Sequence, residues 1–359
     1  MLKRAAALFL IGTSLATWMS CGSTVSRFVY AAVPGANQIF AYREDPNSGI
    51  LTALTTSPTA AGPAVEAVAV HPSKKFLYAA NSAEADISLF TIASSGTITE
   101  VTPRTQVGSN ATTPTLLAMD PGGNFLYVGN IGASNPSISV FSIDSSTGAL
   151  AAVGPPFSLG ISPLNMKLSP NGNVLYITAA GSPGYIEVWS VIAGVIQQGV
   201  VQVIQPGTNP YGLAIDPTGA HLYTANTGDN SISEYSISSA DGSLTELSGS
   251  PIGETFSSPL ALLVDSSGTY LYVANEGSSN LGAFSIGSDG SLTLLTNSPF
   301  GTGAEPSFIA QDPNGKFLFV GNQSSPVIQS FSLDASSGTL TSVATYTIGN
   351  TPTSIAVSP

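Results

Sequence analysis

Short runs of alternating apolar and polar residues recur along the chain, and turn-forming residues separate them. Segments 138–141 and 232–235 alternate strictly, which is typical of a β-strand with one buried face. Residues 216–219 read Asp-Pro-Thr-Gly, a sequence that suits a type I turn. No window of residues 27–359 carries the 3.6-residue apolar period of a helix. The pattern therefore predicts an all-β protein.

An apolar segment with an aromatic end repeats along the chain. Its copies are Phe28-Val29-Tyr30, Phe76-Leu77-Tyr78, Phe125-Leu126-Tyr127, Val174-Leu175-Tyr176, His221-Leu222-Tyr223, Tyr270-Leu271-Tyr272 and Phe317-Leu318-Phe319. Their last residues are 48, 49, 49, 47, 49 and 47 positions apart. Such a regular period indicates one supersecondary unit per repeat rather than several unrelated domains.

Each repeat contains sequence for four strands, so the chain is predicted to form a seven-bladed β-propeller with four-stranded antiparallel blades. The first copy begins at its second strand, near Phe28, whereas residues 354–357 form an isolated first strand. We therefore expect the C-terminal strand to join the N-terminal blade and close the ring. Such closure removes two open sheet edges. The predicted propeller spans residues 27–359.

The first twenty residues have the layout of a secretory signal. Lys3 and Arg4 precede an apolar stretch that is too short to remain as a spanning helix. Cys21 follows directly and is the only cysteine. We predict a lipoprotein-type signal peptide at 1–20, lipid attachment at Cys21 and a short linker at 21–26. Ordinary cleavage nearby, leaving a free thiol, is the alternative.

Composition excludes some classes of partner. Without residues 1–20 the chain carries 7 basic and 21 acidic side chains, a formal charge of −14. An acidic surface repels phosphate backbones, so nucleic-acid binding is not expected. The 43% share of apolar residues excludes a disordered chain.

We expect an exported monomer that contacts a membrane only through its lipid anchor.

The repeat resembles the seven-bladed propeller lactonase family, which includes 6-phosphogluconolactonases and carboxymuconate-lactonizing enzymes. The resemblance rests on Asp-Pro-x-Gly turns and on Leu-Tyr-Val-Ala-Asn at 271–275. The resemblance implies a site made of a His, an Arg, a Glu and a second Arg, each at a fixed position within its repeat. Those slots hold Tyr211, Leu260, Glu276 and Gln323 here. Only Glu276 is retained, and it becomes the candidate catalytic residue; a solvated loop charge is the alternative interpretation.

Residues that break the repeat on the innermost strands are the other candidates. Glu66 is the only charged residue at its position of the repeat, where other copies hold residues such as Thr115 and Ser307. Lys167 occupies a position that is Ala in most of the other copies. Glu66, Asn165, Lys167 and Tyr211 could form a polar ligand-binding site in the central channel. Simple lining of a water-filled channel is the alternative. The two histidines lie in strand and turn slots, so the sequence predicts no metal site and no cofactor.

Loss of both arginines removes the positive charge that would stabilise an oxyanion during lactone opening. The first hypothesis is therefore an exported, non-catalytic propeller that binds another protein or a glycan at the cell envelope, on a periplasmic or outer-membrane face if lipid-anchored. The alternative is a lactone hydrolase with a rearranged site that uses Glu276 on a small lactone.

Overall fold

A computed structural model describes residues 26–109, 111–132, 135–253 and 257–359. Residues 1–25, which include the predicted signal peptide and Cys21, lie outside the described residues. No helix in the described part is long and apolar enough to cross a membrane.

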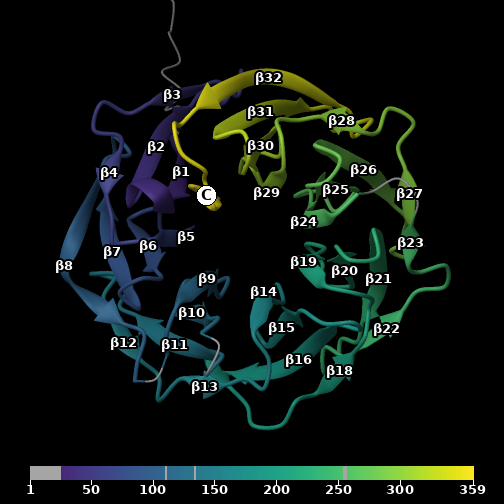
Figure 1. Cartoon of the computed structure of the whole chain (residues 1–359), viewed down its shortest axis with the longest axis horizontal. Coiled ribbons are helices and arrows are strands. Elements are labelled where there is room, and N and C mark those ends of the chain that lie inside the picture. Colours follow the sequence, from purple (N-terminus) through teal and green to yellow (C-terminus); the bar gives the residue numbers. More distant parts are fainter. Residues whose placement is uncertain (1–25, 110, 133–134, 254–256) are drawn as a thin grey trace, which may run out of the picture.

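The chain forms a closed ring of seven antiparallel sheets around a central axis (Figure 1). This confirms the predicted seven-bladed β-propeller. Blade 1 contains β33 (Ser354–Val357), β1 (Arg27–Val33), β2 (Gln38–Glu44), β3 (Leu51–Ala53) and β4 (Thr59–Ala60), with a short 3₁₀ helix at Pro34–Ala36. Blade 2 contains β5 (Val65–Val70), β6 (Phe76–Asn81), β7 (Asp86–Ile92) and β8 (Ile98–Gln106). Blade 3 contains β9 (Pro114–Met119), β10 (Phe125–Asn130), β11 (Ser137–Ile143), β12 (Leu150–Ala152) and β13 (Phe157–Ser158).

The remaining blades repeat the order from the axis outward. Blade 4 contains β14 (Pro163–Leu168), β15 (Val174–Ala179), β16 (Tyr185–Ile192), β17 (Val195–Ile196) and β18 (Gln202–Ile204). Blade 5 contains β19 (Pro210–Ile215), β20 (His221–Asn226), β21 (Ser231–Ile237), β22 (Leu244–Glu246) and β23 (Ile252–Gly253). Blade 6 contains β24 (Pro259–Val264), β25 (Tyr270–Asn275), β26 (Asn280–Ile286), β27 (Leu292–Leu294) and β28 (Phe300–Gly301). Blade 7 contains β29 (Pro306–Gln311), β30 (Phe317–Asn322), β31 (Val327–Leu333) and β32 (Leu340–Thr347).

In five blades the fourth position is not a single strand. In blades 1, 3, 4, 5 and 6 two short strands pair with the third strand, as β12 and β13 both pair with β11. Blades 2 and 7 carry one longer outer strand instead. The alternating pattern is weak in these short outer segments because most of their side chains face solvent, as in β12, where two of the three residues are exposed.

The core lies between the blades. The second strand is almost completely buried in every blade; in blade 6, for example, β25 is buried along its whole length. Each cluster of buried apolar side chains joins two neighbouring blades, as Leu126 of blade 3 packs with Tyr78 of blade 2. A β-sheet with apolar side chains on both faces needs a neighbour on each side, and the ring provides one.

Blade 1 closes the ring by combining both ends of the described chain. β33 pairs antiparallel with β1, from Val29 opposite Val357 to Ala32 opposite Ser354. Beyond the strand, the Phe28 backbone N–H donates to Ser358 Oγ at 2.9 Å, and the Ser358 N–H donates to the Phe28 carbonyl at 2.8 Å. This is the closure expected from the sequence.

A buried charged group joins blade 7 to blade 1. Arg27 Nη1 donates to Asp312 Oδ2 at 3.2 Å and lies 4.0 Å from Glu44 Oε1. Both Glu44 carboxyl oxygens are buried without a hydrogen bond among the described residues. Burial, and then the negative charge of Asp312, raises the pKa of Glu44 to about 7.

Deleting residues 350–359 should lower the thermal unfolding midpoint of the whole ring, because β1 would lose its inner partner and blade 1 its channel-facing strand. Calorimetry measures the shift. The milder variant Ser358→Ala removes one hydrogen-bond partner and should cost only about 1 kcal/mol. A deletion variant with an unchanged midpoint would contradict closure by β33.

Stability should fall as pH rises from about 4.5 to about 7, through the range between the ordinary pKa of Glu44 and its raised value in the fold. The contribution is fully present below pH 4.5 and amounts to roughly 3 kcal/mol. Urea unfolding across this range should show a flatter pH dependence in Glu44→Gln. The exposed control Glu246→Gln should keep the wild-type slope; equal slopes in wild type and Glu44→Gln would refute the assignment.

Candidate active site

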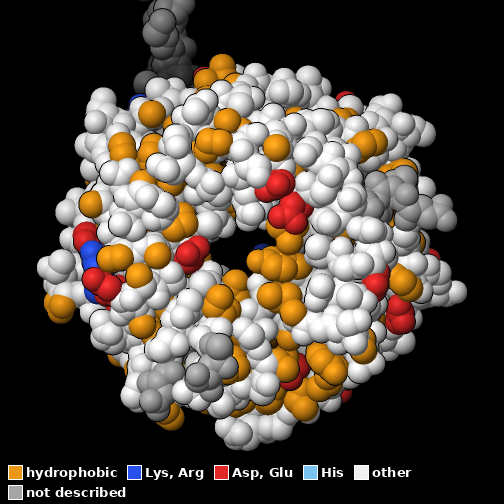
Figure 2. All heavy atoms as spheres, viewed as in Figure 1, with side chains coloured by type: hydrophobic (Ala, Val, Ile, Leu, Met, Phe, Trp, Pro, Cys, Tyr) orange, Lys and Arg blue, Asp and Glu red, His pale blue; other side chains and the backbone are white. Residues whose placement is uncertain are grey.

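The central channel is the cavity formed by the innermost strands of all blades. It has a volume of about 640 Å³. We call one end of the channel the crossover mouth. At this end the innermost strands begin, and loops such as the one after Asn275 join the second strand of a blade to its third strand. Figure 2 shows acidic side chains at the rim of the central opening, with hydrophobic ones between them.

Glu66 lies at the crossover mouth as the second residue of β5 and lines the channel. Ser82, which lies in the loop directly after β6, donates from its Oγ to Glu66 Oε1 at 3.5 Å. Burial raises the pKa of Glu66, and the hydrogen bond from Ser82 partly opposes that rise. The Glu66 backbone carbonyl accepts a hydrogen bond from Thr353 Oγ1 at 2.7 Å, which fixes the strand against the segment before β33.

Tyr211 is the second residue of β19 and is half-buried in the channel wall. Its backbone carbonyl accepts a hydrogen bond from Thr178 Oγ1 of blade 4 at 2.8 Å. Burial raises the pKa of the Tyr211 phenol, and the charges of Glu276 and Glu66 raise it further. The phenol therefore stays protonated at neutral pH and can donate a hydrogen bond.

Glu276 follows β25 directly, at the crossover mouth, and is half-buried. Its backbone N–H donates to the Ser258 carbonyl at 2.9 Å, which holds the loop against the start of blade 6. Burial raises the pKa of the Glu276 carboxyl, and the charge of Glu305 raises it further. Glu276 is thus a carboxylate whose proton affinity has moved toward the neutral range.

Glu305 is a functional candidate that the sequence reasoning missed. It precedes Pro306, the first residue of β29, and adopts a left-handed backbone with φ of 57°. Ser324 Oγ donates to its Oε2. The same slot holds Ala64, Thr113, Asn209 and Ser258, all also left-handed, so an acid there is exceptional. Comparing the residue before each opening strand, and not only the residue after it, would have found this signal.

Asn165 and Lys167 lie further along β14, as its third and fifth residues. Lys167 is three residues further into its strand than Glu66, a displacement of about 10 Å along the channel. Its side chain is accessible to solvent inside the channel, while protein surrounds it. This crowding lowers the pKa of the ammonium by desolvation, and the accessibility limits the effect. No ion pair involves Lys167 in the described ranges.

The predicted channel residues therefore share one cavity but divide into two groups. Glu66 and Tyr211 line the cavity at the crossover mouth; Glu276 is not among the lining residues but follows β25 at the same end, and its charge and that of Glu66 raise the pKa of Tyr211. Lys167 is separate, because no carboxylate contributes to its pKa shift. Asn165 lines the same cavity beside it. Leu260 and Gln323, which hold two of the family slots, also line the channel.

Both histidines lie in structural positions. His71 Nε2 is 2.8 Å from the Gly123 carbonyl oxygen of the next blade, and His221 Nδ1 is 2.8 Å from Asp216 Oδ2 in its own turn. Over the described residues, no group of three or more acidic, His or Cys side chains is arranged to hold a metal ion.

Solved structures of several bacterial proteins have the same fold. The periplasmic gluconolactonase of Pseudomonas aeruginosa is 19% identical, with a TM-score of 0.77 over 93% of this chain and 99% of that one. A candidate 6-phosphogluconolactonase from Bacteroides fragilis is 19% identical, with a TM-score of 0.79 over 94% of this chain and 99% of that one. At such identities the likeness concerns the fold. No curated protein matches the chain.

The sequence profile described as a lactonase with a 7-bladed β-propeller matches residues 5–115, 108–194, 207–299 and 254–357. These segments together span nearly all of the ring. The chain therefore belongs to the lactonase family of seven-bladed β-propellers.

Proposed function

We propose that this chain hydrolyses lactones at the crossover mouth, with Glu276 as the general base. The observation that carries the proposal is geometric: Glu66 and Tyr211 lie at the start of β5 and β19, and Glu276 follows the end of β25, so all three lie at one end of the channel in a chain that belongs to a lactonase family. The sequence alone favoured a non-catalytic scaffold, because three of four family slots are changed. Glu305 and Glu66 add acidic groups that this reasoning had not combined with Glu276.

Hydrolysis begins when the Glu276 carboxylate accepts a proton from water as the water oxygen attacks the lactone carbonyl carbon. A base works best when its pKa lies near the working pH. Burial and the charge of Glu305 move the pKa of Glu276 in that direction. The ring C–O bond then breaks, and the leaving oxygen takes the proton back from Glu276 to give a hydroxy acid.

The carbonyl oxygen gains negative charge when water adds, and a donor must stabilise it. The Tyr211 phenol is suited to this role because its raised pKa keeps it protonated. A single neutral donor gives less stabilisation than the two arginines of the family pattern. We therefore expect modest rates.

The acidic residues at the crossover mouth restrict which lactones can bind there. Glu66, Glu276 and Glu305 are all acidic, and Lys167 lies about 10 Å further along the channel. A phosphate group at the mouth would face like charges. The substrate that fits is an uncharged lactone.

Turnover of neutral sugar and aromatic lactones, followed by proton release in a pH-stat, tests the proposal. Glu276→Gln should lower kcat/KM by about a hundredfold or more, since a positioned base contributes about 10² to 10⁴. Tyr211→Phe should also lower kcat. Glu246→Gln, on the outer strand β22, serves as the control and should match wild type.

Two outcomes would overturn the proposal. Wild-type turnover that survives in Glu276→Gln would remove Glu276 from the mechanism. A wild type that opens no lactone in the panel would instead favour the binding scaffold, a propeller that presents a rigid surface to a protein or glycan.

Glu305→Gln should shift the acid limb of the kcat/KM profile to lower pH. Glu305 raises the pKa of Glu276 through like-charge repulsion, so removal of its charge lets Glu276 lose its proton earlier. The profile is measured between about pH 4 and 8. An unchanged limb, or a shift to higher pH, would show that Glu276 is not the group that titrates.

We also propose that the protein acts outside the cytoplasm, held at a membrane by a lipid on Cys21. The basic start, the short apolar stretch and the single cysteine of residues 1–21 support this location. An exported site also agrees with a neutral lactone rather than a phosphorylated metabolite.

A further inference from the structure

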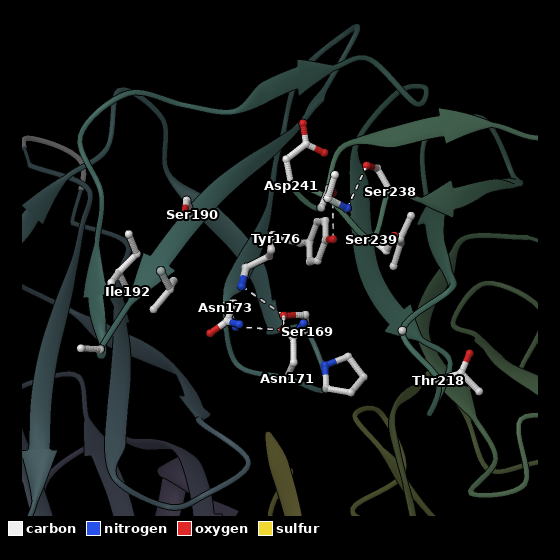
Figure 3. Close-up of a pocket in the computed structure, with 18 residues that line it drawn as sticks. Ser169, Asn171, Asn173, Tyr176, Ser190, Ile192, Thr218, Ser238, Ser239 and Asp241 are labelled. Carbon is white, nitrogen blue, oxygen red and sulfur yellow. Dashed lines mark hydrogen bonds between the residues drawn. The ribbon is translucent and has the colours of Figure 1, made fainter.

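A second cavity, the 4/5 groove, lies between blades 4 and 5 on the face opposite the crossover mouth. It has a volume of about 660 Å³ and is open to solvent. Its walls come from turns that join first to second strands and from hairpins that follow third strands, including residues 169–173 and 237–242. Figure 3 shows these two walls facing each other across the groove.

A break in the repeat lies at the groove. In each blade a residue at or next to the start of the second strand packs against a hairpin glycine of the next blade. Six of the seven such contacts in the described residues use a ring, from Phe28, Phe76, Phe125, His221, Tyr270 and Phe317. Between blades 4 and 5 the residue is Val174, which packs against Gly242 and lines the groove. Valine is smaller than these rings, so the side chain at this position fills less volume than in the other repeats.

The groove walls carry many short polar side chains. Ser169 Oγ donates to Asn171 Oδ1 at 2.7 Å and accepts from the Val174 N–H at 3.0 Å, which fixes the turn on one side (Figure 3). On the other side, Ser243 donates to Asp241 Oδ1 through its backbone N–H and its hydroxyl. These hydrogen bonds lower the pKa of Asp241, so it remains an ionised acceptor.

Three of the lining side chains keep their hydrogen-bonding capacity for a ligand. The side chains of Asn173, Ser190 and Ser239 have no hydrogen-bond partner within the part of the chain that the structure describes. Together they offer donors and acceptors from both walls of the groove. No lysine or arginine is among the groove's lining residues.

An apolar strip runs beside these polar groups. The hairpin of blade 4 has a two-residue turn, with Ala193 and Gly194 both at positive φ, which is typical of a type I′ turn. This turn places Ile192 at the edge of the groove with 61% of its surface exposed. Pro170, which is exposed, continues the apolar surface, and Val174, with 8% of its surface exposed, adds little to it.

We propose that the 4/5 groove binds a neutral saccharide. A sugar ring has apolar C–H faces, which fit the exposed side chains of Ile192 and Pro170, and hydroxyl groups that suit Asn173, Ser190 and Asp241. An aromatic ligand would cover the polar side chains without forming hydrogen bonds to them, which would make the free energy of binding less favourable. An anion would meet Asp241 without a compensating cation. The site is separate from the proposed hydrolytic site and does not depend on it.

Saturation-transfer NMR on the full chain with glucose, galactose and maltose at millimolar concentration tests this inference. Wild type should give transfer to at least one sugar. Val174→Phe restores the ring of the other repeats, fills the groove and should weaken binding by about tenfold or more. Its unfolding midpoint should stay equal or rise, because the added ring is buried. Asn173→Ala, an exposed change, should weaken binding without altering the midpoint.

Tyr270→Phe, at the same repeat position two blades away, is the matched control and should bind as wild type does. Lactone turnover should be equal in Val174→Phe and wild type, which keeps the two sites distinguishable. The inference fails if no sugar gives transfer, or if binding is equal in wild type, Val174→Phe and Asn173→Ala. Transfer to phenol but to no sugar would also overturn it, in favour of an aromatic ligand.

Discussion

A buried tyrosine hydroxyl that bonds to a glycine of the next blade is the contact on which the ring depends. It occurs six times in the described residues, with O···O distances of 2.8 to 3.1 Å. Tyr78, for example, donates to the Gly148 carbonyl of blade 3. Gly148 has φ of 74°, and a Cβ there would lie 2.6 Å from a ring carbon of Phe76. Glycine is required both by the backbone and by the close approach.

This contact separates the residues that build the ring from those that can vary. The tyrosines and glycines lie on second strands and hairpins, away from the axis. The innermost strands bear side chains such as Glu66 and Tyr211 that take no part in it. Chemistry can therefore change at the channel without loss of the fold, which explains how a family-like frame carries a changed site.

The sequence predicted the fold well because each blade is specified locally. The aromatic within every second strand and the glycine of every hairpin recur at a regular spacing in the sequence. Closure by residues 354–357 follows from the incomplete first repeat. The split outer strands were not predicted, since segments such as Leu150–Ala152 are short and mostly exposed.

The candidate site was predicted only in part, because it is assembled across blades. Glu66, Asn165, Lys167 and Tyr211, which the sequence places on innermost strands, line one cavity. The sequence-based prediction did not consider how far along the channel axis each side chain lies. This distance depends on the position within the strand, and it separates Lys167 from the acidic residues. Glu305 was missed for a different reason: its effect is the charge it adds beside Glu276, and the two residues belong to different blades.

Both proposed sites arise where the repeat is broken, and the kind of break decides the kind of site. At the crossover mouth, charged residues such as Glu66 replace the neutral residues of the other repeats, so the backbone is kept and the electrostatics change. At the 4/5 groove, Val174 replaces a ring, so volume is lost while the polar turns of the repeat remain. The first break places carboxyl groups with raised pKa values at the crossover mouth, whereas the carboxyl group of the groove, Asp241, has a lowered pKa and stays ionised. In a ring held by contacts away from the axis, each change can be tolerated alone, and the two faces can acquire separate roles.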